Sequence, residues 1–271
     1  MRIAILYICT GRYTIFWPEF YASCEEFFFK GHAKEYFVFT DGALKYSSID
    51  NVHRIEQKRL GWPYDTLQRF NLFRSQERLL EKFDLIFFCN ANIEFMQHVD
   101  QKILPKDECS IIVTQHPGYV DKKECDFPFE RDQRSLAYIG YGRGEVYVCG
   151  GFNGGYTSAY LRMIATLSDN IEADLNNGII ARWHDESHLN RYIQDHPYHL
   201  LPVSYCYPQY EIFREKEIVR IRDKACFGGS SMLRDQPRIL RVRLKDQLRY
   251  FAGKSGLLPY LRHIRKMLKI R

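Results

Sequence analysis

Short runs of mostly apolar residues recur along the chain and are separated by stretches in which apolar residues have helical spacing. This spacing predicts helices over Phe16–Phe29 and Leu67–Lys82. The short runs are almost continuously apolar, which is typical of strands that are buried on both faces. We therefore predict strands over Ile3–Ile8, Tyr36–Thr40, Leu85–Cys89, Ile111–Thr114 and Val146–Cys149.

The alternation of strands and helices predicts an α/β domain with a Rossmann-like, mostly parallel central sheet flanked by helices. In sheets of this kind, ligands bind beyond the carboxyl ends of the strands. Thr10 follows the first predicted strand and Asn90 follows the third. We therefore expect a binding site near these two residues.

The composition is that of an ordinary globular protein with an excess of aromatic residues. Hydrophobic residues make up 45% and charged residues 27% of the 271 residues, enough chain for one large or two small domains. Aromatic residues reach 15%. Because aromatic rings pack in cores and also stack on sugars and nucleobases, this excess weakly favours a carbohydrate or nucleotide ligand.

The eight cysteines include no Cys-x-x-Cys pair, and several lie within apolar runs, as Cys89 does. Buried, reduced thiols in a cytoplasmic protein fit this distribution better than disulfides or a zinc cluster. The stretch Met1–Cys9 resembles a buried strand more than a signal peptide, and no window approaches the length of a membrane span. We therefore expect a cytoplasmic protein.

The composition changes after Asp235, so we expect a domain over residues 1–235 and a basic tail over residues 236–271. In the tail, Ile239–Phe251 and Leu257–Ile270 combine cations with apolar residues at helical spacing. Two interpretations remain open: a helical tail packed on the domain, or an amphipathic anchor on the anionic inner face of the cytoplasmic membrane. Because the tail dominates the net charge of +6, we expect no nucleic-acid partner.

The densest group of reactive side chains is the segment Trp183–Asn190, which reads Trp-His-Asp-Glu-Ser-His-Leu-Asn. An ordinary interpretation is that Asp185 or Ser187 caps a helix that continues to Tyr192. The two histidines are four residues apart, but Glu186 follows the first of them by two. The His-Glu-x-x-His pattern of zinc enzymes is therefore absent.

A second polar group, Asn90-Ala91-Asn92, follows the apolar run Leu85–Cys89. Hard divalent cations prefer carboxylate oxygens, whereas asparagine offers neutral oxygens and amide donors. We therefore expect weak metal binding here, while the amides can still hydrogen-bond a ribose or a phosphate. The alternative is a polar turn after a buried strand.

Together these two segments resemble the signatures of the family 6 glycosyltransferases, the family of the blood-group A and B transferases and the α-1,3-galactosyltransferases. The resemblance spans roughly Ile3 to Lys224, and the tail lies outside it. It implies a GT-A fold and retaining transfer of a sugar from a UDP-sugar donor. In bacterial members, Asn-x-Asn at this position goes with metal-independent transfer, so the resemblance implies that no divalent metal or other cofactor is required.

By this resemblance, Glu186 is the catalytic carboxylate that faces the anomeric carbon and borders the acceptor. Asp185 holds the donor sugar, Trp183 holds the acceptor, and His116 hydrogen-bonds the acceptor galactose. One carboxylate suffices for retention, because the departing phosphate can take the acceptor proton. A glycosyl-enzyme and an oxocarbenium-like centre stabilised by Glu186 both remain open.

The resemblance also implies a set of residues around the donor. Tyr13 lies by the uridine, Trp62 and Arg69 lie beside the sugar or phosphate, and Arg222 with Lys224 offsets the charge of the departing UDP. Each of these residues alone also fits an ordinary role in packing or on a basic surface. The implied donor-binding residues are Ile8, Thr10, Tyr13, Trp62, Arg69, Asn90, Ala91, Asn92, Cys149, Gly150, Gly151, Asp185, Arg222 and Lys224.

Cys149-Gly150-Gly151 corresponds to the donor-selecting residues of the family. Glycine at the third position leaves room for a 2-acetamido group, so the resemblance implies UDP-N-acetylgalactosamine as donor. One side chain changes such a preference by only about 1–3 kcal/mol, which leaves an α-1,3-galactosyltransferase as the alternative. A fucosylated galactose on a surface glycan or lipopolysaccharide precursor is the expected acceptor, although Pro128 and Tyr205–Pro208 depart from the animal members. Outside the enzymes, the alternative is a non-catalytic glycan- or nucleotide-binding module.

Overall fold

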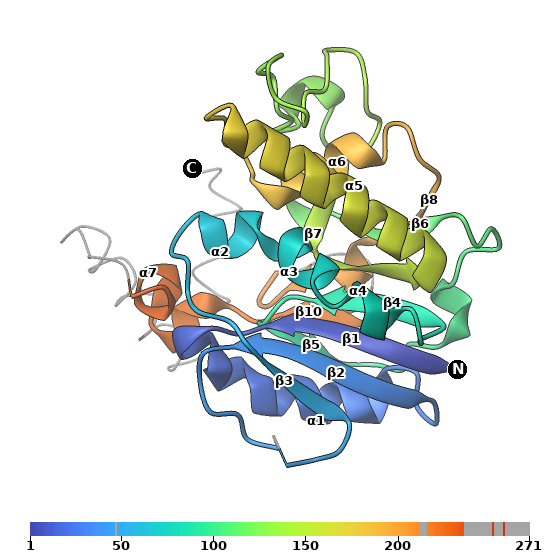
Figure 1. The fold of residues 1–271 in the computed structure, drawn as a ribbon, viewed down its shortest axis with the longest axis vertical. Helices are drawn as coiled ribbons and strands as arrows, with labels where there is room; N and C mark the ends of the chain where they lie inside the picture. The colour runs from blue at the N-terminus through green and yellow to red at the C-terminus, as the bar shows by residue number, and fades with distance from the viewer. Residues whose placement is uncertain (47, 212–215, 236–250, 252–256, 258–271) are drawn as a thin grey trace.

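A central seven-stranded sheet organises the molecule (Figure 1). The computed structural model describes residues 1–46, 48–211, 216–235, 251 and 257. In this part of the chain the strand order is β3-β2-β1-β4-β7-β6-β8, and only β7 runs antiparallel to its neighbours. The prediction of an α/β domain with a mostly parallel sheet is confirmed. The strands are β1 (Arg2–Ile8), β2 (Ala33–Thr40), β3 (Val52–Glu56), β4 (Leu85–Cys89), β6 (Ile111–Gln115), β7 (Val148–Tyr156) and β8 (Tyr198–Leu201).

Helices cover both faces of the sheet (Figure 1). On one face lies α1 (Trp17–Phe27), and on the other lie α3 (Arg69–Arg74), α5 (Thr157–Asn176) and α6 (Asp185–Tyr192). The remaining α-helices of the described residues are short: α2 (Tyr64–Leu67), α4 (Glu77–Leu80) and α7 (Gly229–Leu233). Of the helices described, none is long and apolar enough to cross a membrane.

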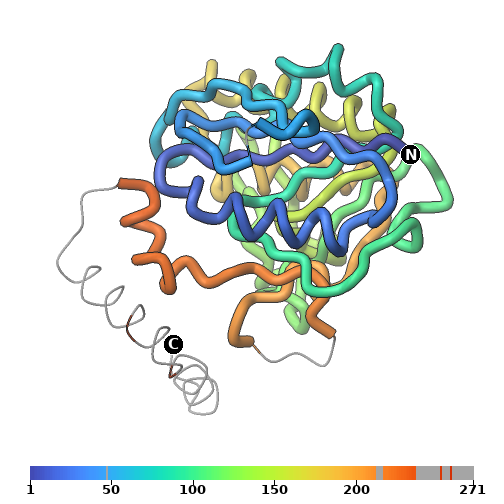
Figure 2. The backbone as a smooth tube through the Cα atoms, turned by 90° about the horizontal axis from the view of Figure 1, so that it is seen from below, coloured from blue at the N-terminus to red at the C-terminus, as the bar shows by residue number. Residues whose placement is uncertain are grey.

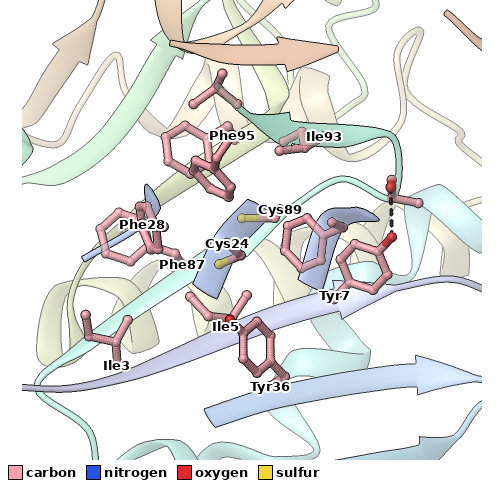
Figure 3. Close-up of a cluster of buried hydrophobic side chains, with 14 of the residues drawn as sticks. Ile3, Ile5, Tyr7, Cys24, Phe28, Tyr36, Phe87, Cys89, Ile93 and Phe95 are labelled. Carbon is pink, nitrogen blue, oxygen red and sulfur yellow. Dashed lines mark hydrogen bonds between the residues drawn. The ribbon is translucent and has the colours of Figure 1, made fainter. Parts of the chain in front are cut away.

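Alternate residues of β1 divide the apolar core into two layers, because successive side chains of a strand point to opposite faces. Ile3, Ile5 and Tyr7 belong to the layer under α1, whereas Ala4 and Leu6 belong to the layer under α3 and α5. Figure 3 shows the first layer, where aromatic rings and cysteines fill the space between sheet and helix. The uninterrupted apolar run of β1 is therefore explained by burial on both faces.

A small second sheet packs beside α1 and contains strands from the C-terminal part of the domain. Its strand order is β5 (Ile93–Phe95), β10 (Val219–Ile221) and β9 (Tyr207–Pro208). After β10 the chain reaches α7, which packs beside the 3-10 turn Gly11–Phe16 that follows β1 (Figure 2). Segments from the two ends of the domain therefore meet where a ligand site was expected.

Two predicted elements differ from the structure. The predicted helix Leu67–Lys82 is divided among α2, α3 and α4, because the backbone leaves the helical region at Gln68 and Gln76. The predicted strand Val146–Cys149 begins later and continues through a glycine-rich stretch to Tyr156. Glycine is required there, since a Cβ atom on Gly154 would lie 2.2 Å from Cδ1 of Phe87 on β4. The predicted basic tail, residues 236–271, lies outside the described residues apart from Phe251 and Leu257.

Candidate active site

A cavity of about 250 Å³ opens at the carboxyl ends of β1 and β4, where the sequence predicted a site. The structure brings most of the predicted residues to its walls. Those that line the cavity are Ile8, Thr10, Tyr13, Trp62, Arg69, Asn90, Ala91, Gly150, Gly151, Trp183, Asp185, Glu186 and Lys224. Four predicted residues lie outside the lining: Asn92, His116, Cys149 and Arg222.

Glu186 lies in the first turn of α6, and both of its carboxylate oxygens are held by hydrogen bonds. The hydroxyl of Tyr147 donates to Oε1 over 2.8 Å, and the backbone N–H of Gly150 donates to Oε2 over 2.7 Å. One donor precedes β7 and the other belongs to it, so the carboxylate is fixed against the central sheet. This geometry orients Glu186 on the cavity wall. Sequence reasoning missed Tyr147, whose position 39 residues away gave no local signal.

Asp185 is 1% exposed and forms an ion pair with Arg69 of α3. Burial raises the pKa of Asp185 to about 7, while the positive charge of Arg69 opposes this rise. A second nitrogen of Arg69, Nη1, donates to the carbonyl oxygen of Gly150 over 2.7 Å. The Gly150 residue thus binds Glu186 through its N–H and Arg69 through its C=O.

The absence of a side chain at Gly150 is part of this arrangement. A Cβ atom there would lie 3.3 Å from Nη2 of Arg69 and 3.3 Å from Oδ2 of Asp185. At Gly151 an added Cβ would meet only Asn90, at 3.7 Å from its Cβ. Gly150 therefore permits the close ion pair, whereas a Cβ at Gly151 would make only an ordinary van der Waals contact with Asn90.

The first turn of α6 is fixed by contacts that differ from the predicted caps. The helix begins at Asp185, and neither Asp185 nor Ser187 caps it; the N-cap residue is His184, whose φ is positive at +55°. Ser187 Oγ instead accepts a hydrogen bond from the N–H of Trp183. The amide of Asn190 pairs with both backbone groups of Val148, over 2.9 Å each, and anchors the helix to β7.

The turn after β4 has a structural role at its second asparagine. Asn92 Nδ2 donates to the carbonyl of Arg222 over 2.7 Å, and the Arg222 N–H donates to the Asn92 carbonyl over 2.8 Å. The hydroxyl of Tyr7 binds the carbonyl of Ala91 over 2.8 Å (Figure 3). Of the two asparagines in this turn, Asn90 lines the cavity and Asn92 does not. A neutral amide does not fit a dication as a pair of carboxylates would.

The two cations predicted to bind phosphate, Lys224 and Arg222, have different positions in the structure. Lys224 lines the cavity, with Nζ 5.2 Å from the centre of the Tyr13 ring. The guanidinium of Arg222 instead packs over the rings of Phe16 and Phe227, at 5.5 and 4.7 Å. Arg222 therefore supports the fold of the C-terminal segment from outside the cavity.

Two further arginines line the cavity, Arg59 and Arg234, and sequence reasoning assigned neither of them to the site. The guanidinium of Arg234 lies 3.7 Å over the ring of Trp62, and Arg59 forms an ion pair with Asp235 over 2.5 Å. Asp235 also binds Arg12 over 2.8 Å. No local pattern in the sequence singled out either arginine.

The two predicted acceptor residues besides Glu186, His116 and Trp183, differ in their relation to the cavity: Trp183 lines it and His116 does not. His116 Nδ1 accepts a hydrogen bond from the N–H of Gly118 over 3.0 Å, and burial lowers its pKa. The His116 ring lies 5.6 Å from the ring of Tyr147, which in turn binds Glu186. Trp183 is 45% exposed at the cavity edge. The ring of His116 therefore packs on the tyrosine that holds the carboxylate.

A mostly parallel sheet flanked by helices, with a cavity at its strand ends, fits the GT-A type of glycosyltransferase fold. A sequence model of glycosyltransferase family 6 matches residues 1–234. The chain therefore belongs to glycosyltransferase family 6, and it is an enzyme.

Curated relatives agree with this assignment. The O-antigen biosynthesis glycosyltransferase WbnI of Escherichia coli is 36% identical over 226 residues, which are 83% of this chain and 95% of that protein. The globoside α-1,3-N-acetylgalactosaminyltransferase 1 of Gallus gallus is 30% identical over 216 residues, or 76% of this chain and 61% of that protein. The histo-blood group ABO system transferase 2 of Rattus norvegicus is 28% identical over 219 residues, 76% of this chain and 64% of that protein. The chain thus spans less than two thirds of these two vertebrate relatives.

Proposed function

We propose that this enzyme is a retaining α-1,3-N-acetylgalactosaminyltransferase that moves GalNAc from UDP-GalNAc to a fucosylated galactose without a divalent metal. The observation that carries the proposal is the fixed carboxylate of Glu186 on a cavity wall that also holds Lys224 and Tyr13. In this proposal the cavity binds a nucleotide near Lys224 and Tyr13 and presents the carboxylate of Glu186 to the sugar.

In the proposed reaction, Glu186 stabilises positive charge at the anomeric carbon or bonds to it, while the bond from that carbon to the UDP oxygen breaks. The leaving phosphate oxygen takes the proton of the acceptor hydroxyl as the new glycosidic bond forms. Arg69 and Asp185 keep the Gly150 residue in place, and Gly150 keeps Glu186 oriented. Preorganised groups of this kind contribute on the order of 10²–10³-fold each when they act on the transition state.

Charge on the diphosphate is offset by side chains in this proposal. Lys224, Arg59 and Arg234 line the cavity, and the turn after β4 contributes the neutral side chain of Asn90. We expect transfer to persist in EDTA and to change little on addition of Mn²⁺ or Mg²⁺. Loss of turnover in chelator, restored by either cation, would contradict metal independence.

The choice of GalNAc rests on the absence of a side chain at Gly151 in the cavity lining, which leaves room for a 2-acetamido group. A relative named as an N-acetylgalactosaminyltransferase supports it. UDP-galactose is the alternative donor, because one methyl group shifts such a preference by only about 1–3 kcal/mol. Comparing both donors with the wild type and Gly151→Ala tests the choice. We expect the variant to lose preference for GalNAc; an equal galactose preference in both proteins would contradict it.

The decisive experiment incubates the protein with each UDP-sugar and a fucosyllactose acceptor, with and without chelator, and determines product mass and linkage. Glu186→Gln should lower kcat by about 10³-fold or more with UDP affinity retained. The control is Glu81→Gln, an exposed residue after α4, which should leave kcat unchanged. Equal turnover in wild type and Glu186→Gln would remove Glu186 from the mechanism.

We also propose that the basic tail, residues 236–271, holds the enzyme on an anionic membrane surface in the cytoplasm. Truncation after Asp235 should release the protein from phosphatidylglycerol vesicles and spare turnover with a soluble acceptor. Persistent vesicle binding after truncation would show that another surface is responsible.

A further inference from the structure

Two cysteine thiols face each other close to the catalytic carboxylate. The Sγ atoms of Cys149 and Cys206 lie 3.1 Å apart, and the residues are 4% and 6% exposed. Contact with Cys149, burial and the charge of Glu186 together raise the pKa of Cys206. The pair therefore consists of two reduced thiols in contact, near Glu186.

The two thiols belong to different parts of the fold. Cys149 lies on β7 directly before Gly150, whose N–H holds Glu186. Cys206 lies directly before β9, the strand that pairs with β10 in the small sheet. A covalent bond between the sulfurs would join the central sheet to the small sheet next to the residue that orients the carboxylate.

The distance between the sulfurs is short enough for oxidation to join them. A disulfide has an S–S length of about 2.05 Å, so the sulfurs at 3.1 Å need to approach by about 1 Å. Thiols that oxidise to a disulfide need a second thiol within such reach. Among the eight cysteines, none of which is in a disulfide, this pair meets that requirement.

We propose that Cys149 and Cys206 form a modification site at which a hydroperoxide closes a disulfide and slows sugar transfer. The Cys149 thiolate attacks one oxygen of hydrogen peroxide, which breaks the O–O bond and gives a sulfenic acid and, after protonation, water. The Cys206 sulfur then displaces the sulfenic oxygen, which leaves as a second water, and the S–S bond forms. Two thiols are oxidised by two electrons and one peroxide is reduced to two waters.

The expected effect on catalysis follows from the position of Cys149. Closing the pair moves the peptide that joins Cys149 to Gly150, and with it the N–H that binds Glu186. A displacement of about 1 Å in a catalytic arrangement can cost on the order of 10²-fold in rate. We expect turnover to fall by about 10- to 100-fold and to return when a dithiol reduces the bond.

The test uses the full chain with the exposed Cys109 and Cys125 replaced by serine, so that their oxidation does not contribute. The reduced protein is treated with hydrogen peroxide, quenched with catalase, and divided between a turnover assay and non-reducing peptide mapping. We expect a linked peptide that contains Cys149 and Cys206, lacks two hydrogen atoms, and accumulates as turnover falls. Dithiothreitol should remove the linked peptide and restore turnover.

Cys206→Ser in the same background is the matched variant, and each protein is compared with its own reduced state. We expect dithiothreitol-reversible inhibition to be lost in this variant. If the variant does not fold, the correlation between linked peptide and turnover in the parent protein decides. Absence of the linked peptide, or its presence with unchanged turnover, would overturn the proposal.

Discussion

The cavity has two regions that are built differently: a buried floor and an exposed rim. In the floor, formed by Arg69, Gly150, Asp185 and Glu186, the ion pair is almost fully withdrawn from solvent and is joined to Glu186 through Gly150. In the rim, formed by Arg59, Trp62, Arg234 and Asp235, the side chains of the Arg59–Asp235 pair are 37% and 35% exposed. Under the proposed function, this difference means that charge orients the carboxylate in the floor and attracts the donor in the rim.

The electrostatics of the two regions explain this division. A buried charge that loses its partner carries a desolvation penalty of several kcal/mol, so the floor has one stable arrangement. Exposed pairs contribute only about 0–1 kcal/mol and are screened by salt, so the rim can exchange partners when a ligand arrives. Substitutions should therefore have large effects on stability and kcat in the floor, and small effects on affinity in the rim.

The largest effect is expected for Arg69→Leu, which leaves Asp185 buried without its partner. We expect the free energy of unfolding to fall by about 3–5 kcal/mol, with loss of turnover, because Gly150 and Glu186 lose their support. Arg74→Leu, on the same helix, removes an exposed ion pair with Asp169 and should cost no more than about 1 kcal/mol. Urea denaturation measures both. Equal losses in the two variants would contradict the proposed difference between buried and exposed pairs.

The next effect is expected for Tyr147→Phe, which removes one hydrogen bond to Glu186. Hydrogen bonds to charged groups contribute about 1.5–3 kcal/mol, so kcat should fall by roughly 10- to 100-fold with little change in donor KM. Tyr36→Phe removes a comparable bond, from Tyr36 to Glu25, on the α1 side of the sheet. A similar kcat in Tyr147→Phe and Tyr36→Phe would show that Tyr147 does not position the carboxylate.

The pH dependence of stability sharpens the description of the floor. Burial raises the pKa of Asp185 from its usual value near 3.8 to about 7, so the folded protein binds a proton more tightly than the unfolded chain. The stability from this group is present below about pH 4 and is lost as pH rises to about 7. Asp185→Asn should flatten this part of the curve of unfolding free energy against pH. An unchanged slope would mean that another group causes this part of the pH dependence.

The sequence predicted where the cavity lies in the sheet better than it predicted the rim, for a physical reason. The strands β1 and β4 are buried on both faces, so their uninterrupted apolar runs gave nearly correct bounds, and the residues that follow them line the cavity. By contrast, Arg59 and Arg234 come together only through folding and have no local pattern. The backbone direction after β10 likewise decides that Lys224 enters the cavity while Arg222 packs on Phe227. The spacing of residues along the chain does not specify the backbone direction after a strand.

The smallest effect is expected in the rim, for Asp235→Asn. The substitution removes the partner of Arg12 and the shorter of two ion pairs of Arg59, which keeps Asp41 at 3.7 Å, so the positive charge of Arg59 in the cavity lining is less compensated. Unfolding free energy should change by less than about 1 kcal/mol, whereas UDP affinity should rise a few-fold at low salt and less at high salt. Calorimetry at two salt concentrations measures this, with Asp132→Asn, which loses an exposed pair with Arg134, as control. A weaker affinity for UDP in Asp235→Asn would mean that Asp235 positions Arg59 for the diphosphate rather than competing with it. The rim would then share the orienting role of the floor.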